Sequence, residues 1–377
     1  MIKSRDCKIE ATEAELSQLK NFKRLGNTTI LDVFTNKEQQ SCTKVPIWIM
    51  RQAGRYLPEF REIRKKYKFF ELLENPNLCS YVTLMPIKKF NLDAAIIFSD
   101  ILVLSNCLGI KFEMIEGIGP VCNNSVKCFE QIGMMNFELD LKTKLYTVYE
   151  SIALTRKELA NKCPLIGFTA APWTLAAYMI SGSSKNQFSE AVKMFEEDNK
   201  KFETFLINIK SLIVQHLFNQ ALYGCEILQV FDSHFGILND KELLQSFIID
   251  INNRLAIDVK SKFAEYDMHV PLILFPGNCD YSVYEILKSS EYDCISIHHS
   301  KDLSQAQKIL SNKIVQGNLD PAILRDSTEE TLRCEIRKVY KNCILEKVIA
   351  NLGHGIDKST PEENVAHFVD EVHKLKM

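Results

Sequence analysis

Four arginines gather around one predicted turn, and their spacing indicates a site for a negatively charged ligand. The short apolar run 45–50 is typical of a buried strand, and Arg51 follows it directly. Arg55, Arg61 and Arg64 come next along the chain. A guanidinium fork can hold two oxygens of a carboxylate or phosphate at once. Arg51 and Arg55 therefore predict binding of a polyanionic small molecule or a phosphate.

The turn between these arginines is predicted from Gly54 and Pro58. Glycine lets the chain turn after a strand, and proline is typical of the first turn of a helix. Arg61 and Arg64 would share one face of that helix, because they are three positions apart. Exposed charges usually contribute little, so a solvated helix surface is the better interpretation for these two arginines alone.

Asp100 is the strongest single candidate for chemistry. It closely follows the apolar run 94–98, in a context that would desolvate its carboxylate. An ionised carboxylate there would accept N–H groups and stabilise positive charge. The alternative is that Asp100 caps a turn or a helix, since Ile101 begins another apolar stretch. On position alone both interpretations stay open.

Three further candidates follow other apolar runs: Tyr178, Ser233 and His354. For Tyr178, on a helix-like segment, a structural aromatic is the simpler interpretation. Ser233 stands between an aspartate and a histidine. Adjacent strand residues point to opposite faces, so these three do not form a local nucleophilic triad. His354 stands between two glycines, where it could donate to a carboxylate or titrate near neutral pH.

The scaffold for these side chains is predicted from eight short apolar runs, each followed by a turn. The runs are 46–50, 94–98, 165–168, 227–231, 272–275, 294–297, 313–316 and 348–351. Helix-period segments between them predict a parallel sheet. Eight such units predict an α/β fold, a (β/α)8 TIM barrel, whose active sites lie at the carboxyl ends of the strands. The competing open doubly wound sheet would favour a G-x-G-x-x-G turn, and the sequence has none.

The domain organisation is predicted to be simple. A polar N-terminal arm, residues 1–44, precedes a single catalytic barrel, residues 45–377. One region breaks the repeat, because residues 104–130 carry three glycines and a proline around short alternating runs. We expect this region to be a hairpin insertion after the second strand, over the barrel mouth.

Composition excludes several classes of function. With 377 residues, 46% hydrophobic residues and a net charge of -2, the chain is typical of a globular protein without a global basic field. Neither nucleic acid nor a membrane is an expected partner. Twelve scattered cysteines without a C-x-x-C pair indicate a reducing compartment. Adjacent His298 and His299 raise the idea of a metal, but no H-x-C or H-E-x-x-H motif supports one. The first twenty residues show no secretory signal, while a transit peptide already removed stays open.

The stretch Met50–Arg61 resembles the N-terminal signature of the uroporphyrinogen decarboxylase family of haem biosynthesis. Residues 167–175, Gly-Phe-Thr-Ala-Ala-Pro-Trp-Thr-Leu, are similar to its second signature. Residues 97–102, 316–321 and 351–355 are also similar to family segments. The resemblance covers about residues 45–373, in order.

This resemblance implies a barrel enzyme that needs neither cofactor nor metal and usually forms a homodimer. It would remove the four acetate carboxyl groups of uroporphyrinogen III to give coproporphyrinogen III and carbon dioxide. The compartment would be the cytoplasm or, alternatively, a plastid. Carried over by position, the substrate-binding residues would be Arg51, Gln52, Ala53, Gly54, Arg55, Arg64, Asp100, Tyr178, Ser233 and His354.

The expected catalytic residues are Asp100, Arg51 and Tyr178. Protonation of the pyrrole carbon next to an acetate makes the ring cationic, and Asp100 would stabilise that cation while it accepts pyrrole N–H groups. The arginines would hold acetates, Tyr178 and Ser233 would orient the substrate, and His354 would bind a propionate. The residue that acts as general acid is not assigned.

Two segments depart from the family pattern. The sixth predicted strand of the family usually ends in a Gly-Leu-Asp-Trp-like sequence, whereas residues 296–299 read Ser-Ile-His-His. Residues 276–279, Pro-Gly-Asn-Cys, are also atypical.

Two other functions compete with the decarboxylase interpretation. Similar barrels serve as zinc-dependent methyltransferases acting on corrinoid or thiol substrates, and these need a His/Cys zinc set. The other rival is a porphyrinogen-binding protein without catalytic activity.

Overall fold

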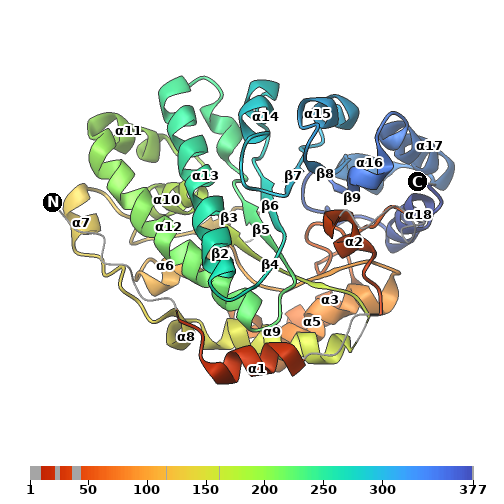
Figure 1. Cartoon of the computed structure of the whole chain (residues 1–377), viewed down its shortest axis with the longest axis horizontal. Coiled ribbons are helices and arrows are strands. Elements are labelled where there is room, and N and C mark those ends of the chain that lie inside the picture. Colours follow the sequence, from red (N-terminus) through yellow and green to blue (C-terminus); the bar gives the residue numbers. More distant parts are fainter. Residues whose placement is uncertain (1–9, 22–25, 36–43, 116, 161, 376–377) are drawn as a thin grey trace.

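A curled parallel sheet forms the centre of the structure, a computed structural model that describes residues 10–21, 26–35, 44–115, 117–160 and 162–375. Helices surround the sheet on its outer side (Figure 1). Seven strands make the sheet in the order β1 (Ala95–Ile96), β4 (Leu165–Ala170), β5 (Ile227–Phe231), β6 (Leu272–Phe275), β7 (Cys294–Ser296), β8 (Ile314–Leu319) and β9 (Val348–Leu352). All six pairings are parallel, so every strand points its carboxyl end to the same edge.

The helices occupy the segments between the strands and both ends of the described chain. They are α1 (Glu13–Asn21), α2 (Thr29–Thr35), α3 (Pro58–Lys66), α4 (Phe69–Leu73), α5 (Pro76–Lys89), α6 (Val103–Cys107), α7 (Phe129–Gly133), α8 (Leu141–Lys144), α9 (Tyr146–Leu159), α10 (Pro172–Ser181), α11 (Ser189–Glu197), α12 (Asn199–Leu222), α13 (Glu242–Ala264), α14 (Tyr281–Leu287), α15 (Leu303–Ile309), α16 (Pro321–Asp326), α17 (Glu329–Tyr340) and α18 (Glu362–His373), with 3-10 turns η1 (Phe235–Leu238) and η2 (Leu345–Lys347). Prolines open α3, α5, α10 and α16, where the missing N–H costs no hydrogen bond.

The predicted first strand, 46–50, is wrong as a regular strand. This segment makes one isolated parallel bridge, between Ile47 and Ala350 of β9. The cause is local, because Pro46 has no N–H and side chains take the N–H groups that a neighbouring strand would need. The N–H of Ile47 donates to Asp93 Oδ2 (2.9 Å), that of Ile49 to Gln52 Oε1 (3.1 Å) and that of Met50 to Asn351 Oδ1 (2.9 Å).

The core has two parts, one on each face of the sheet. The larger part lies between the strands and the surrounding helices. The smaller part fills the inside of the curl, where isoleucines of β1, β4, β5, β6 and β9 meet Trp48. Helix α2 adds Ile30 and Val33 to this inner cluster. A buried polar chain also crosses the interior, since Trp48 Nε1 donates to Gln316 Oε1 over 2.8 Å.

Asp93 ties the amino end of the sheet together. Its fully buried carboxylate accepts hydrogen bonds from Asn27 (2.8 Å), Lys44 (2.8 Å) and the N–H of Ile47. The ring of His373, at the end of α18, is 2.7 Å from the same carboxylate. Burial alone would raise the pKa of Asp93, but the hydrogen bonds from His373, Lys44 and Asn27 outweigh it and hold the pKa below its ordinary value.

The two remaining strands, β2 (Glu113–Ile115) and β3 (Gly119–Val121), pair antiparallel in the region between β1 and β4. The chain after β3 packs on α10, because the N–H of Cys122 donates to the carbonyl of Gly182 and that of Val126 to the carbonyl of Met179, both over 2.8 Å.

The predicted arm, residues 1–44, lies partly outside the described residues, and its described part contains α1 and α2. Among the helices of the described ranges, none has the length and apolar character needed to cross a membrane.

Candidate active site

Arg51 stands at the tightest point of the turn that follows the segment 45–50. Its backbone is left-handed, with φ of 65°, a conformation that side chains other than glycine adopt at a cost. The guanidinium of Arg61 braces this turn, donating to the carbonyls of Arg55 (2.8 Å) and Tyr56 (2.9 Å). Gly355 makes room for Arg51, because a Cβ atom there would lie 2.4 Å from Arg51 Cδ.

The surroundings of Arg51 bring several predicted site residues together. Arg51 keeps solvent-exposed surface, yet the protein atoms around it lower its pKa by desolvation. Arg55 lowers this pKa further, whereas Tyr178 and Asp100 act in the opposite direction. These electrostatic influences place Arg55, Asp100 and Tyr178 within interaction range of Arg51.

Asp100 lies just beyond the carboxyl end of β1, with its two oxygens in different situations. Oδ1 accepts the N–H of Leu102 over 3.2 Å. Oδ2 is buried and has no hydrogen-bond partner among the described residues. Burial raises the pKa of Asp100 to about 6, although the N–H groups of Leu102 and Ile101 and the charge of Arg51 pull it down. A buried oxygen without a partner costs stability, and a ligand N–H would satisfy it.

Hydrogen bonds to α5 fix the backbone just before Asp100. The N–H of Phe98 donates to Thr83 Oγ1 over 2.9 Å, and the thiol of Cys79 donates to the carbonyl of Phe98 over 2.8 Å. The chain therefore leaves the sheet at a fixed point.

Tyr178 comes from α10 and is almost entirely buried, with 6% of its surface exposed. Its hydroxyl lies 3.2 Å from Nε2 of His234. Phe112 and Phe188 pack edge-on against its ring, with centroids 6.0 and 4.9 Å away. Burial raises the pKa of Tyr178, and Asp100 adds to this, while Ser184 and Arg51 lower it. The phenol is therefore a neutral hydrogen-bonding group.

Two histidines complete the surroundings of Arg51. The pKa of His234 is lowered to about 4, mainly by burial and also by the nearby His354 and Arg51. His354 keeps solvent-exposed surface, yet desolvation by the protein atoms around it and the charge of Arg51 lower its pKa to about 4 as well. Both rings are therefore neutral near pH 7, so they act as hydrogen-bonding groups next to the arginine.

Asp232, at the end of β5, is a second buried carboxylate on the same edge of the sheet. Thr174 Oγ1 donates to its Oδ1 (2.7 Å) and Asn252 Nδ2 donates to its Oδ2 (2.8 Å). Burial raises its pKa to about 6 against these two hydrogen bonds. Asp232 thereby links β5 to α10 and α13.

The remaining predicted substrate-binding residues make contacts within the protein or lie half-buried in turns. The Gln52 side chain is fully buried, accepting from the N–H of Ile49 and donating to the carbonyl of Ala94 over 3.2 Å. Arg64 donates to the carbonyl of Tyr67 over 2.6 Å, at the end of α3. Half-buried Ser233 lies between Asp232 and His234, and Ala53 and Gly54 are half-buried in the turn. A direct role of these residues in substrate binding stays a prediction.

Three residues outside the predicted set contact Tyr178, and tertiary packing brings them there. His234 contacts Tyr178, and its position directly after Ser233 at a strand end was the available signal. Phe112 and Phe188 reach Tyr178 from segments whose sequence patterns give no sign of it.

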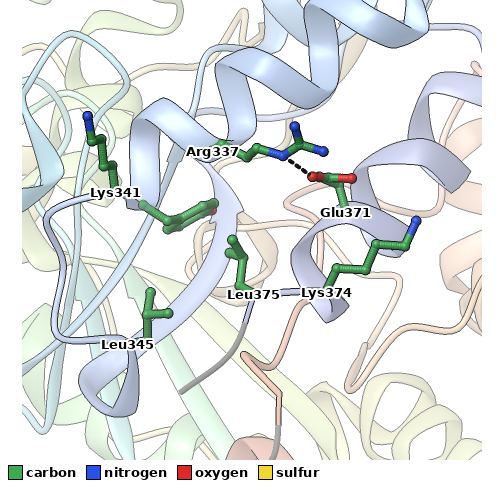
Figure 2. A pocket seen from close by; sticks show the side chains of 7 residues that line it. Arg337, Lys341, Leu345, Glu371, Lys374 and Leu375 are labelled. Carbon is green, nitrogen blue, oxygen red and sulfur yellow. Dashed lines mark hydrogen bonds and ion pairs between the residues drawn. The ribbon is translucent and has the colours of Figure 1, made fainter.

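The described ranges contain no group of three or more His, Cys, Asp or Glu side chains arranged to hold a metal ion. A hollow does lie between α17 and α18, where Glu371 accepts from Arg337 over 2.6 Å (Figure 2). None of Arg51, Asp100 and Tyr178 lines it.

Comparison with known proteins identifies the family. A sequence model described as uroporphyrinogen decarboxylase (URO-D) matches residues 25–375. A uroporphyrinogen decarboxylase of Danio rerio is 37% identical over 356 residues, which cover 94% of this chain and 95% of the relative. The enzyme of that name from Dictyostelium discoideum is 35% identical over 359 residues, with coverage of 94% and 95%.

Among solved structures, a methyltransferase from Methanosarcina mazei superposes with a TM-score of 0.76 at 17% identity, covering 93% of this chain and 98% of its own. At that identity the likeness concerns the fold alone. The family match spans nearly the whole chain, and the relatives exceed one third identity over almost their full length. The chain therefore belongs to the uroporphyrinogen decarboxylase family, a family of carboxy-lyases.

Proposed function

We propose that this chain decarboxylates the four acetate side chains of uroporphyrinogen III to give coproporphyrinogen III, and that Asp100 is the centre of the reaction. The observation that carries this role is the buried Oδ2 of Asp100 near Arg51, which has no hydrogen-bond partner in the part of the chain that the structure describes. The pyrrole N–H groups of a porphyrinogen are the donors that such an oxygen requires. A substrate with eight carboxylates also accounts for the arginines in the same place.

The chemistry follows from this arrangement. A proton adds to the pyrrole carbon next to an acetate, and the ring becomes cationic. The bond to the carboxylate then breaks, its electron pair neutralises the ring, and carbon dioxide leaves. A second proton reaches the freed methylene carbon as the first leaves the ring, so each round consumes one proton net. Ionised Asp100 stabilises the cation more than the neutral ground state, which lowers the barrier.

The other residues position the substrate. Arg51 and Arg55 hold acetates, and Arg51 is the group beside the reacting carboxylate. Tyr178 orients the substrate through its hydroxyl, which His234 holds at 3.2 Å. Ser233 and His354 bind the substrate farther from the reacting carboxylate, and His354 binds a propionate. The substrate itself supplies the electron sink, so the proposed reaction requires no cofactor or metal.

The scaffold is proposed to be a closed (β/α)8 barrel. The segment 45–50 would act as its eighth strand, between β9 and β1. In support, the N–H of Ala350 donates to the carbonyl of Pro46 and that of Asp93 to the carbonyl of Ile47, both over 2.8 Å. The β2–β3 region would cover the barrel mouth, and the contact of Phe112 with Tyr178 supports this. A homodimer in the cytoplasm, or in a plastid, stays a prediction.

An anaerobic assay tests the proposed function. Purified protein, treated with a chelator, is incubated with uroporphyrinogen III, and the oxidised products are separated by their number of carboxyl groups. We expect a progression from eight carboxyls to four without any added cofactor. Unchanged substrate from folded protein would contradict the proposal. Methyl transfer that appeared only with added zinc and a methyl donor would favour the methyltransferase. Substrate binding without turnover would favour a porphyrinogen-binding protein.

A further inference from the structure

The backbone just before Asp100 is bonded to the sheet on one side only. β1 is the first strand in the sheet order, and the N–H of Ile97 donates to the carbonyl of Ile166 in the neighbouring β4 over 3.0 Å. Successive residues of a parallel strand turn their backbone groups to opposite sides, so the N–H of Phe98 faces away from β4. On that side the carbonyl of Ala94 accepts from the Gln52 side chain. Side chains therefore take the place of a neighbouring strand along this edge.

Thr83 of α5 provides the acceptor for Phe98. The N–H of Phe98 donates to Thr83 Oγ1 over 2.9 Å. The Thr83 hydroxyl gives its own hydrogen to the carbonyl of Cys79, one helical turn earlier, over 2.8 Å. A hydroxyl has a single hydrogen, so the oxygen can only accept from Phe98, and the direction of both hydrogen bonds is fixed. Thr83 is fully buried, so its loss would leave the N–H of Phe98 without a ready substitute from solvent.

Two further contacts hold Phe98 against the helices. Its carbonyl accepts from the thiol of Cys79 over 2.8 Å. Its ring packs edge-on against Phe60 of α3 and Phe69 of α4, with centroids 5.6 and 5.7 Å away. The N–H, the carbonyl and the ring of Phe98 are all held, so this residue is a fixed point of the chain.

We propose that Thr83 is a positioning residue for the decarboxylation, fixing the backbone at Phe98 so that Oδ2 of Asp100 meets the pyrrole N–H groups. This inference rests on the proposed function and adds to it a residue that does not touch the substrate. Only Ser99 separates the fixed point from Asp100. Oδ2 itself has no hydrogen bond among the described residues, so the backbone decides where this oxygen lies.

A displaced Asp100 should affect the chemical step more than substrate binding. Hydrogen bonds weaken steeply as their angle and distance change. The ring is cationic only during the reaction, so a carboxylate that has moved loses most of its effect in the transition state. Arg51 and Arg55, which are proposed to hold the acetates, do not depend on the bond between Thr83 and Phe98.

Helix α9 offers a matched control in Thr155. This threonine is also fully buried, and its hydroxyl donates to the carbonyl of Ser151, one helical turn earlier, over 2.6 Å. In the described part of the chain its hydroxyl accepts no backbone N–H. Thr155→Val therefore removes the bond within the helix alone, whereas Thr83→Val removes the same kind of bond together with the acceptor of Phe98.

The test measures kcat and KM for uroporphyrinogen III in Thr83→Val, Thr83→Ser and Thr155→Val, well below the melting temperature of each protein. Thr83→Val should lower kcat by about tenfold to a hundredfold with KM within about threefold, the pattern of a misplaced catalytic group. Thr83→Ser keeps the hydroxyl and should recover most of kcat, and Thr155→Val should match the unmodified protein. If Thr83→Val does not fold, Thr83→Ala removes the same acceptor without placing a methyl group against the N–H.

Several kinetic outcomes would overturn the inference. Normal kcat in folded Thr83→Val would remove the role, and an equal loss in Thr155→Val would assign the effect to general stability. A raised KM with normal kcat would indicate a binding effect instead. A loss that Thr83→Ser does not recover would assign it to packing of the methyl group.

Ligand-free crystal structures of the two valine variants separate this inference from the proposed function. The Asp100 carboxylate should be displaced in Thr83→Val and keep its place in Thr155→Val. An Asp100 that has not moved in Thr83→Val would overturn the inference whatever the activity. If the unmodified protein has no decarboxylase activity, the proposed function fails, while the crystal structures still decide whether Thr83 places Asp100.

Discussion

Asp100 and Asp232 are two buried carboxylates at the same edge of the sheet, and burial raises the pKa of each to about 6. They differ in their partners. Asp232 has one donor for each oxygen, Thr174 and Asn252, whereas Oδ2 of Asp100 has none among the described residues. Equal pKa values thus accompany different hydrogen-bond partners. A raised pKa alone does not distinguish a structural carboxylate from one that awaits a ligand, but the count of hydrogen-bond partners does.

The largest expected effect comes from Asp100→Asn. The amide keeps the shape but cannot stabilise a cationic ring, so kcat/KM should fall by about 10³-fold, the upper range for loss of an electrostatic stabiliser. The melting temperature should be unchanged or higher, because ionising this buried carboxylate at neutral pH opposes folding. Steady-state kinetics and thermal denaturation measure both quantities. Near-normal turnover would remove Asp100 from its proposed role.

Asp232→Asn should show the reverse pattern, with a smaller effect. An amide nitrogen would face either the hydroxyl of Thr174 or the amide of Asn252, leaving a buried donor unpaired. The free energy of unfolding should fall by about 1–3 kcal/mol, while kcat/KM stays within about threefold. Denaturant titration gives the first value and the decarboxylation assay the second. A loss of activity as large as that of Asp100→Asn, without a loss of stability, would invalidate the distinction between these carboxylates.

A pH profile sharpens the same comparison without changing any residue. Asp100 must be ionised to stabilise the cation, so kcat/KM should decline below pH about 6, by about tenfold per pH unit. Activity falls as the pH falls because the protonated form of Asp100 is inactive. His234 and His354, with pKa values of about 4, stay neutral through this range. The acid limb should persist in Asp232→Asn and disappear from the residual activity of Asp100→Asn, and an acid limb shared by both variants would assign it to another group.

Much of the scaffold is predictable because strands and helices have local patterns. The runs 227–231 and 272–275 coincide with β5 and β6, since apolar runs bounded by turns report burial directly. The segment 46–50 has the same local pattern but is not a regular strand. Its N–H groups donate to Asp93, Gln52 and Asn351. Asp93 and Asn351 are distant in sequence, so these partners leave no mark on the local pattern.

The candidate site, like the scaffold, is predictable only in part. Asp100 and Arg51 could be selected because polar residues just beyond buried strands meet at one edge of a parallel sheet. The sequence predicts the turn from Gly54, yet it is Arg51 that has a positive φ. The surroundings of Tyr178 depend on Phe112, Phe188 and His234, which come from three different segments. Such contacts depend on how elements pack, and one sequence does not contain that information in any local pattern.

The hydrogen-bonded hub at Asp93 has a consequence for biosynthesis. Its partners Asn27 and Lys44 precede it, but His373 is 280 positions further along the chain. At translation rates of 5–20 residues per second, a ribosome needs roughly 14–56 s to add those positions. During that interval the nascent chain has a carboxylate destined for full burial whose final partner has not yet been made. Closure of the sheet's amino end therefore comes late in synthesis, because it needs the end of α18.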